Sequence, residues 1–284
     1  MQTALAINAG LLVLGIAGGV LFDSLAVFAD AGHVLSDLGA IALGLVAASL
    51  ASRGAGPQRT FGYHRGEVLA ALVNGLVLAA IAAAIVIAAI GRLSDPPEIE
   101  GAGVLAVGLI GLAGNVWATA VLARGERADI NLEAVLRHSA ADALGSLAVV
   151  AAAVAVLAAG WGRADPIASL AIAALILAAS VRLVREPFDV LMESAPARVD
   201  VDELASTMGG VEGVREVHEL HVWTVTSGFE ALAAHVVTAP GTDRDRARRE
   251  VEFVVRERFG IEHTTLQMEE SADPGELLQV DPRR

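Results

Sequence analysis

Long apolar runs dominate the chain up to about residue 190. Six of them are rich in Ala, Leu, Val, Ile and Gly and carry almost no charge, and they cover residues 4–21, 25–51, 68–91, 101–123, 139–160 and 164–181. Each holds roughly 18 to 27 residues, enough for a helix that rises about 1.5 Å per residue to cross a bilayer. Buried helices of a large soluble core are the alternative, but such helices are usually shorter. The pattern therefore predicts six transmembrane helices.

From about residue 196 the chain changes character, because charges become frequent and long apolar runs stop. Pro187 and Pro196 bracket a predicted linker. The shorter patterns that follow predict, in order, a helix, two strands around Ser227-Gly228, a charged amphipathic helix and a strand, over residues 200–208, 214–225, 229–238, 243–258 and 261–268. This α-β-β-α-β order predicts a small α+β domain of ferredoxin-like type. We expect a membrane domain at residues 1–192 and a second domain at residues 193–284.

Charge and composition extend this picture. Hydrophobic residues make up 55% of the chain, the formal net charge is −13, and cysteine is absent, so thiolate ligands and disulfides are excluded. From residue 196 on, the chain has 18 acidic residues and 10 arginines, and this negative balance disfavours nucleic acid as a partner. Arginine is the only basic type apart from histidine, and it follows the second, fourth and sixth runs. The positive-inside rule then predicts that these loops and both termini are cytoplasmic.

Two His-x-x-x-Asp pairs lie in separate predicted helices, His33 with Asp37 and His138 with Asp142. A spacing of four places both side chains of a pair on one helix face. Two such faces turned toward each other offer two imidazoles and two carboxylates to one ion, and four N/O ligands suit tetrahedral Zn(II). A charged side chain at mid-membrane costs about 2.5 to 3.5 kcal/mol on insertion scales, so it needs a partner or water. Polar residues that only join helices through hydrogen bonds are the alternative.

Two further polar residues share these helix faces. Asp30 lies three residues before His33, where it could serve as an entry ligand or proton acceptor, or simply anchor the interfacial end of its helix. Asn131 lies seven residues before His138, two helical turns away on the same face. It could orient the site through a hydrogen bond, or cap the start of the helix. The sequence leaves both choices open.

Four motifs in order resemble the cation diffusion facilitator family of zinc-transporting antiporters. They are Ser24 through Asp37, Arg59 through Asn74, Asn131 through Ser146, and the segment His218-Glu-Leu-His-Val-Trp223, and the similarity covers nearly the whole chain. The resemblance implies Zn(II)/H⁺ antiport by alternating access and no enzymatic activity. Zn(II) and protons compete at histidine, because imidazole binds metal only when it is neutral. A compact chain without a histidine-rich loop suggests a bacterial inner membrane.

Other interpretations remain beside this one. The same carrier could move Co(II), Ni(II), Cd(II), Mn(II) or Fe(II), since affinity order does not select zinc. A zinc-sensing membrane protein without flux would need only the tail. An intramembrane zinc enzyme is disfavoured, because the chain has no His-Glu-x-x-His helix. His64 lies in the loop where relatives often carry a further metal site, but Arg59 and Tyr63 stand where some relatives have histidine, so we interpret His64 as structural or peripheral.

The tail holds a second group of candidate ligands. If Ser227-Gly228 forms a two-residue turn, His218 and His235 fall on one sheet face as diagonal neighbours, about 7 to 8 Å apart. The resemblance implies that His263 and Glu269 complete a cytoplasmic zinc site there, which two subunits of a homodimer could share and which would regulate transport. His221 alternates to the other face and is expected to pack rather than bind metal.

Overall fold

The computed structural model describes the backbone of residues 2–123 and 132–270; the side chains of residues 2–5, 118–119, 121–123 and 132–139 lie outside the description. The chain divides into two compact units. One unit combines Met1–Ser52 with Leu69–Glu186, and the other combines Arg53–Val68 with Pro187–Arg284.

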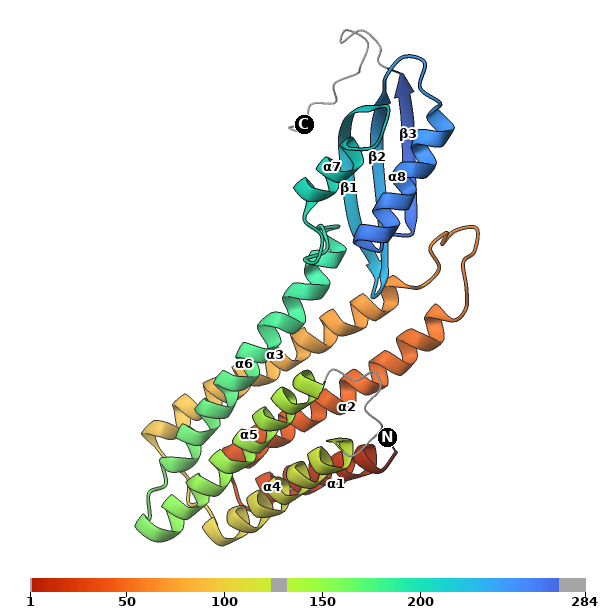
Figure 1. Ribbon diagram of the computed structural model, residues 1–284. Helices are drawn as coiled ribbons and strands as arrows, with labels where there is room; N and C mark the ends of the chain where they lie inside the picture. The colour runs from red at the N-terminus through yellow and green to blue at the C-terminus, as the bar shows by residue number, and fades with distance from the viewer. Residues whose placement is uncertain (1, 124–131, 271–284) are drawn as a thin grey trace. The chain divides into compact units, whose positions relative to one another are not determined.

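Long helices build the first unit (Figure 1). In chain order they are α1 (Gln2–Leu21), α2 (Leu25–Ala51), α3 (Arg65–Ser94), α4 (Gly101–Ala123), α5 (Leu132–Ala159) and α6 (Ala164–Leu191). Within the described residues, four stretches are long and apolar enough to cross a membrane: Leu25–Ala51, Arg65–Ser94, Ala140–Ala159 and Ala164–Leu191. Ala6–Leu21 and Gly101–Trp117 are shorter apolar helices. All six predicted segments are therefore helical, while the crossing of a bilayer by all six stays a prediction.

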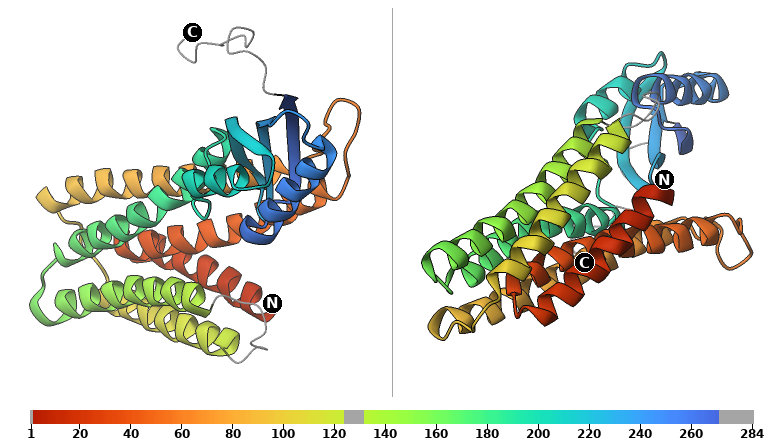
Figure 2. Two further views of the ribbon diagram at one scale, coloured as in Figure 1. Left: turned by 45° about the horizontal axis from the view of Figure 1, so that its top comes forward. Right: turned by 90° about the horizontal axis from the view of Figure 1, so that it is seen from below.

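The helices pack in neighbouring pairs, as the two further views also show (Figure 2). α1 contacts α2 and α4, while α5 contacts α4 and α2. Small residues bring the backbones close: a Cβ on Gly15 would lie 2.8 Å from the Cβ of Ala31, and one on Gly75 would lie 3.0 Å from the backbone of Leu183. Close approach at small residues is typical of helices packed in a membrane. This packing holds α2 and α5 side by side.

A buried carboxylate ties the start of α6 to the start of α2. Asp165 accepts a hydrogen bond from the hydroxyl of Ser24, another from the backbone N–H of Leu25 at 2.8 Å, and a third from that of Ala26 at 3.3 Å. The first backbone N–H groups of a helix lack partners within the helix. Asp165 therefore caps α2 from another helix, although it lies 140 residues from Leu25 in the sequence.

The predicted linker between Pro187 and Pro196 begins later than expected, because α6 continues through Pro187 to Leu191. Proline lacks an N–H, so it removes one hydrogen bond to the residue four positions earlier, but near a helix end this need not stop the helix. An ion pair between Arg182 and Glu186, at 2.6 Å, supports the same stretch. The apolar run ends at Arg182, whereas the helix extends beyond it.

The second unit holds a three-stranded sheet and two helices (Figure 1). The elements are α7 (Val201–Gly209), β1 (Val214–Thr226), β2 (Phe229–Thr238), α8 (Arg244–Phe259) and β3 (His263–Glu270). The sheet order is β1-β2-β3, with β1 antiparallel and β3 parallel to β2. The predicted α-β-β-α-β order is confirmed, and the domain is α+β.

Apolar faces of α7 and α8 cover one side of this sheet. Leu204 and Met208 of α7 and Val251 of α8 are fully buried in a core with Leu232 and Val236 of β2. At the start of α8, Asp243 accepts the backbone N–H of Arg246, and at its end Gly260 takes a left-handed φ of 68°. These caps satisfy free backbone groups at both ends and fix where α8 stops and β3 begins.

Candidate metal centres

A cluster of three candidate ligands forms where α2 meets α5. Nε2 of His33 lies 2.7 Å from Oδ1 of Asp142, at hydrogen-bond distance, and 4.0 Å from Oδ2 of Asp37. One ligand atom from each of these residues lies within 4.8 Å of the other two. The His33–Asp37 spacing supplies one face, and the packing of α5 against α2 brings Asp142 to it. The structure thus brings together three of the four residues predicted for one site.

The remaining predicted member, His138, lies on α5 four residues before Asp142. Its side chain is outside the described part of the chain, and so is the whole of Asn131. The helical backbone of α5 includes both His138 and Asp142. The spacing of four that underlies the prediction is therefore present in a continuous helix.

A polar chain extends from this cluster to Asp30. Asn115 donates a hydrogen bond to the hydroxyl of Ser146 at 3.1 Å and approaches the backbone carbonyl of Asp142 at 3.4 Å. Ser146 in turn donates to Asp30 at 3.1 Å. Asn115 was not predicted as a site residue, although an amide within the apolar run 101–123 is a visible signal in the sequence. Asp30 is consequently joined to α4 and α5 and does not lie at a free helix end.

Glycines make the space that Asp30 occupies. A Cβ placed on Gly145 would lie 2.8 Å from Oδ1 of Asp30, and one on Gly111 would lie 3.7 Å from Oδ2. A contact of 2.8 Å is tighter than a side chain and a carboxylate oxygen accept, so any residue larger than glycine at position 145 would displace Asp30. The position of this carboxylate is therefore fixed by α5 as well as by α2.

A second cluster lies in the sheet of the other unit. The turn at Ser227-Gly228 is confirmed, with Thr226 paired to Phe229 and Gly228 at a φ of 75°. A regular ladder from this turn would leave His218 and His235 diagonal, as predicted. Two irregularities in β1 shift the register, and the histidines become direct partners with ring centroids 5.1 Å apart. The shared face is thus confirmed, and the diagonal placement is wrong.

Glu269 of β3 joins the two histidines. Its Oε1 lies 2.8 Å from Nδ1 of His235, and its Oε2 lies 3.4 Å from Nε2 of His218. Burial alone would raise the pKa of this carboxyl. A hydrogen bond from Gln267 and the neighbouring rings of His235 and His218 outweigh the burial and lower the pKa of Glu269 below its usual value. A carboxylate between two imidazoles is a donor set that suits Zn(II).

His263 does not join this cluster in the structure. It pairs with Ala231 at the start of β3, six residues before Glu269, which corresponds to about 20 Å along a strand. Its ring packs instead against Phe61 and Phe229, with centroids 5.8 and 5.6 Å away. Within one chain, the parallel register of β3 sets His263 at the other end of the strand from Glu269, so its share in the site through a second subunit stays a prediction.

His64 lies in the same group of rings. Its ring meets that of Phe229 edge-on at 6.1 Å, within the unit that contains residues 53–68. Among the described residues, no group of potential metal ligands includes His64 or His263. This packing agrees with the structural role that the sequence favoured for His64.

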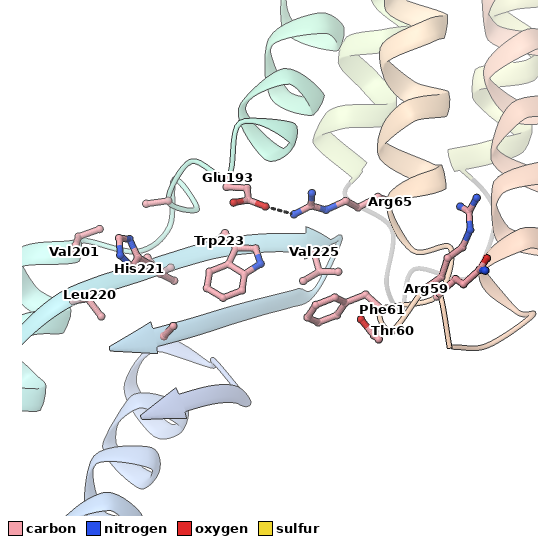
Figure 3. A pocket seen from close by; sticks show the side chains of 15 residues that line it. Arg59, Thr60, Phe61, Arg65, Glu193, Val201, Leu220, His221, Trp223 and Val225 are labelled. Atoms are coloured by element: carbon pink, nitrogen blue, oxygen red, sulfur yellow. Dashed lines mark hydrogen bonds and ion pairs between the residues drawn. The ribbon is translucent and has the colours of Figure 1, made fainter. Parts of the chain in front are cut away.

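An open groove of about 980 Å³ lies in the second unit (Figure 3). His221 and Trp223 of β1 line it together with Phe61 and Arg65, and Arg65 forms a 2.9 Å ion pair with Glu193 at its edge. The predicted alternation of His221 to the other sheet face is wrong, because the bulge pairs it with Ala233, two residues from His235, and so puts it on the face of His218. It is nevertheless not a member of the ligand cluster. The groove offers its one histidine no second histidine or free carboxylate, so it is a poor candidate for a metal site.

Two family models match the chain. The cation efflux transmembrane domain matches residues 1–192, and the cytoplasmic domain of cation efflux proteins matches residues 196–271. Together these matches cover most of the chain. They coincide with the division between long apolar helices and a charged α+β region.

Curated relatives match nearly the full length. The cadmium, cobalt and zinc/H(+)-K(+) antiporter of Bacillus subtilis (strain 168) is 36% identical over 268 residues, covering 93% of this chain and 86% of the relative. The metal cation efflux system protein CzcD of Cupriavidus metallidurans is 33% identical over 287 residues, covering 99% and 91%. The zinc transporter ZitB of Escherichia coli (strain K12) is 35% identical over 268 residues, covering 94% and 85%.

Among solved structures, the metal-bound C-terminal domain of the CzcD transporter from Cupriavidus metallidurans matches 25% of this chain and 99% of its own, with 32% identity and a TM-score of 0.24. The family models and the curated relatives agree on one assignment. The chain is an integral membrane protein with a C-terminal α+β cytoplasmic domain, and it belongs to the cation diffusion facilitator family of metal cation efflux transporters.

Proposed function

We propose that this protein exports Zn(II) from the cytoplasm in exchange for protons, by alternating access through a site made of His33, Asp37, His138 and Asp142. The observation that carries the proposal is the convergence of His33, Asp37 and Asp142 between α2 and α5. Ionisable groups inside a membrane domain are costly and mark ion pathways. His138, one helical turn from Asp142, would supply the fourth ligand of a tetrahedral site.

The contact between His33 and Asp142 supports proton coupling. Its distance of 2.7 Å is that of a hydrogen bond, so a proton lies between the two groups when no metal is bound. Zn(II) binds an unprotonated ring nitrogen and a carboxylate, so the ion and protons compete for His33 and Asp142. In the proposed cycle, protons from the outside reset the ligands after the ion has left.

We assign Asp30 and Asn115 supporting roles at this site. Asn115 links the backbone at Asp142 to Ser146, and Ser146 links to Asp30. Such outer hydrogen bonds orient metal ligands and affect metal affinity. The chain of contacts favours a positioning or proton-accepting role for Asp30 over a role as an interfacial anchor.

The remaining parts of the proposal concern architecture. All six helices α1–α6 would cross the membrane, with residues 1–192 as the transport domain and residues 193–284 as a cytoplasmic domain that senses metal and dimerises. Both termini would face the cytoplasm of a bacterium, and the membrane would be its inner membrane. The cytoplasmic site would consist of His218, His235 and Glu269, and zinc bound there would regulate transport.

Other metals form the alternative substrate set. One relative is named for cadmium, cobalt and zinc, and another for zinc alone. A site of imidazoles and carboxylates accepts several of these ions. We therefore propose Zn(II) as the principal ion, with Cd(II) and Co(II) as additional ions.

The test is metal-dependent proton flux in proteoliposomes that contain the full-length protein. Zn(II), Cd(II), Co(II), Ni(II) and Mn(II) are offered in turn to the wild type, to a His33→Ala/His138→Ala variant, and to Glu98→Gln as a control in an exposed loop. We expect zinc-dependent flux in the wild type and the control, and its loss in the double variant. Equal flux in the double variant would refute the proposed site, and absence of flux in the wild type would favour a sensor.

A further inference from the structure

Glu219 has an unusual backbone conformation beside the cytoplasmic cluster. Its φ is +47°, a left-handed value that only three non-glycine residues show in the described part of the chain. It lies in the irregularity of β1 between His218 and His221, where β1 has one residue more than β2. Glycine is the usual residue at such a position, because a side chain makes this conformation costly. Strain of this kind persists mainly where function requires it.

The extra residue changes which side chains face the core. In a regular strand, alternation would give Val217, Glu219 and His221 one face. In the structure Val217, Leu220 and Val222 pack against the domain core instead. Because of the bulge, Leu220 faces the core, and Glu219 lies on the same side of the sheet as His218 and His235.

The Glu219 carboxylate faces one nitrogen of His235, and Glu269 faces the other. Oε2 of Glu219 lies 3.5 Å from Nε2 of His235, while Oε1 of Glu269 lies 2.8 Å from Nδ1. Nε2 of His218 also points at Glu269, at 3.4 Å, and makes no hydrogen bond within the described residues. Nδ1 of His235, Nε2 of His218 and Glu269 therefore converge, and Glu219 stands on the far side of the His235 ring.

We propose that Glu219 is a positioning residue for the cytoplasmic metal site. When an ion takes the place of the proton between Nδ1 of His235 and Glu269, Glu219 accepts the Nε2–H of His235 and so holds Nδ1 toward the ion with His218 and Glu269. A metal-bound histidine usually donates its other ring N–H to a carboxylate or carbonyl, which fixes the tautomer and the ring orientation. This inference rests on the cytoplasmic site proposed above. Beyond that site, it predicts which ring nitrogen of His235 binds the ion, and it gives a reason for the strained backbone of Glu219 in β1.

Zinc affinity tests the role in full-length protein. The background carries Asp37→Ala and Asp142→Ala, so that the transport site does not contribute, and affinity is measured by competition with a chromophoric chelator. We expect Glu219→Gly to weaken zinc binding about tenfold or more, because loss of a carboxylate that orients a metal ligand typically costs this much affinity. Glu219→Gln keeps an acceptor oxygen and should lose less. Glu216→Gln, which removes a charge from an exposed position of the same strand, should change little.

Thermal unfolding of the metal-free protein provides a separate readout. Glycine accepts a positive φ without strain, so Glu219→Gly should raise the thermal midpoint of the cytoplasmic domain while it weakens zinc binding. A residue with a merely structural role would lose stability and affinity together. A lower midpoint with unchanged affinity would therefore overturn the proposal.

Histidine tautomers give the decisive measurement. In protein labelled with ¹⁵N-histidine, zinc should bind His235 through Nδ1 and leave a protonated Nε2, with the signals assigned by their loss in His235→Ala. Zinc on Nε2 would make Glu219 a direct ligand and refute the positioning role. Equal affinity in all Glu219 variants would refute this role alone. If the Asp37→Ala/Asp142→Ala background with Glu219 unchanged bound no zinc, both the cytoplasmic site and the role of Glu219 would be refuted.

Discussion

The two clusters of candidate ligands use the same side-chain types on different scaffolds. The membrane cluster takes His33 and Asp37 from one helix and Asp142 from another. The cytoplasmic cluster takes His218, His235 and Glu269 from three different strands. A helix repeats every 3.6 residues, so the spacing of four holds one pair of ligands without help from tertiary structure. Strands hold ligands together only if their registers agree.

The helical and strand scaffolds therefore make the two sites depend on different structural features. In the membrane domain, a change in one helix would move two ligands together. In the sheet, two bulges in β1 are needed to bring His218 directly opposite His235. A bulge adds one residue and shifts every later pair in the ladder. In the helix-built site, local sequence therefore determines the His33–Asp37 pair and helix packing adds Asp142, whereas the strand-built site depends on backbone irregularities.

The largest expected effect separates the two clusters by function. Asp142→Ala removes a proposed ligand and the partner of His33, and we expect zinc-dependent proton flux to fall by at least about 100-fold, since even outer-shell changes cost 10- to 100-fold. His235→Ala, in the cytoplasmic cluster, should change flux by less than about tenfold. Flux in proteoliposomes measures both variants. A larger loss of flux in His235→Ala than in Asp142→Ala would mean that the cytoplasmic cluster, and not the membrane cluster, carries the ion.

The next largest expected effect is a loss of stability when the Asp165 cap of α2, the helix that carries His33, is removed. Asp165→Ala removes the hydrogen bonds that cap α2, and it leaves Ser24 and two backbone N–H groups without their buried partner. We expect a loss of about 2 kcal/mol in the free energy of unfolding. Thermal or denaturant unfolding in detergent measures it, with Asp95→Asn in an exposed position as the control. Equal stability of the two variants would contradict the capping role.

A smaller effect on zinc flux is expected when the space beside Asp30 is filled. Gly145→Ala places a methyl group 2.8 Å from Oδ1 of Asp30 and must displace it, whereas Gly91→Ala adds a methyl group with no atom within 4 Å. Overpacking of this kind costs about 1 to 3 kcal/mol. We expect about a tenfold loss of zinc flux for Gly145→Ala and none for Gly91→Ala. Normal flux in Gly145→Ala would show that transport does not need Asp30 in its observed position.

The contrast between the scaffolds also explains how far the sequence could predict the structure. Helical period and apolar length sufficed for the helices and for placing His33 with Asp37 on one face of α2. The pairing of α2 with α5 was inferred only from the chemistry of their motifs. The hairpin turn followed from Ser227-Gly228, but the bulges at Glu219 and near Val225 have no local signal, because neither position carries glycine. The register of His218 was therefore beyond prediction from a regular ladder.

The smallest expected effect concerns His263, which the strand register separates from the metal cluster. Its ring packs against Phe61 and Phe229, and Ala231 is its partner in β2. His263→Ala should therefore leave the zinc affinity of the cytoplasmic site within about twofold of the wild type, whereas His218→Ala should lower it at least tenfold. Both are measured by chelator competition in the Asp37→Ala/Asp142→Ala background. A tenfold loss in His263→Ala would mean that His263 reaches the ion from a second subunit, because about 20 Å of strand separates it from Glu269 within one chain.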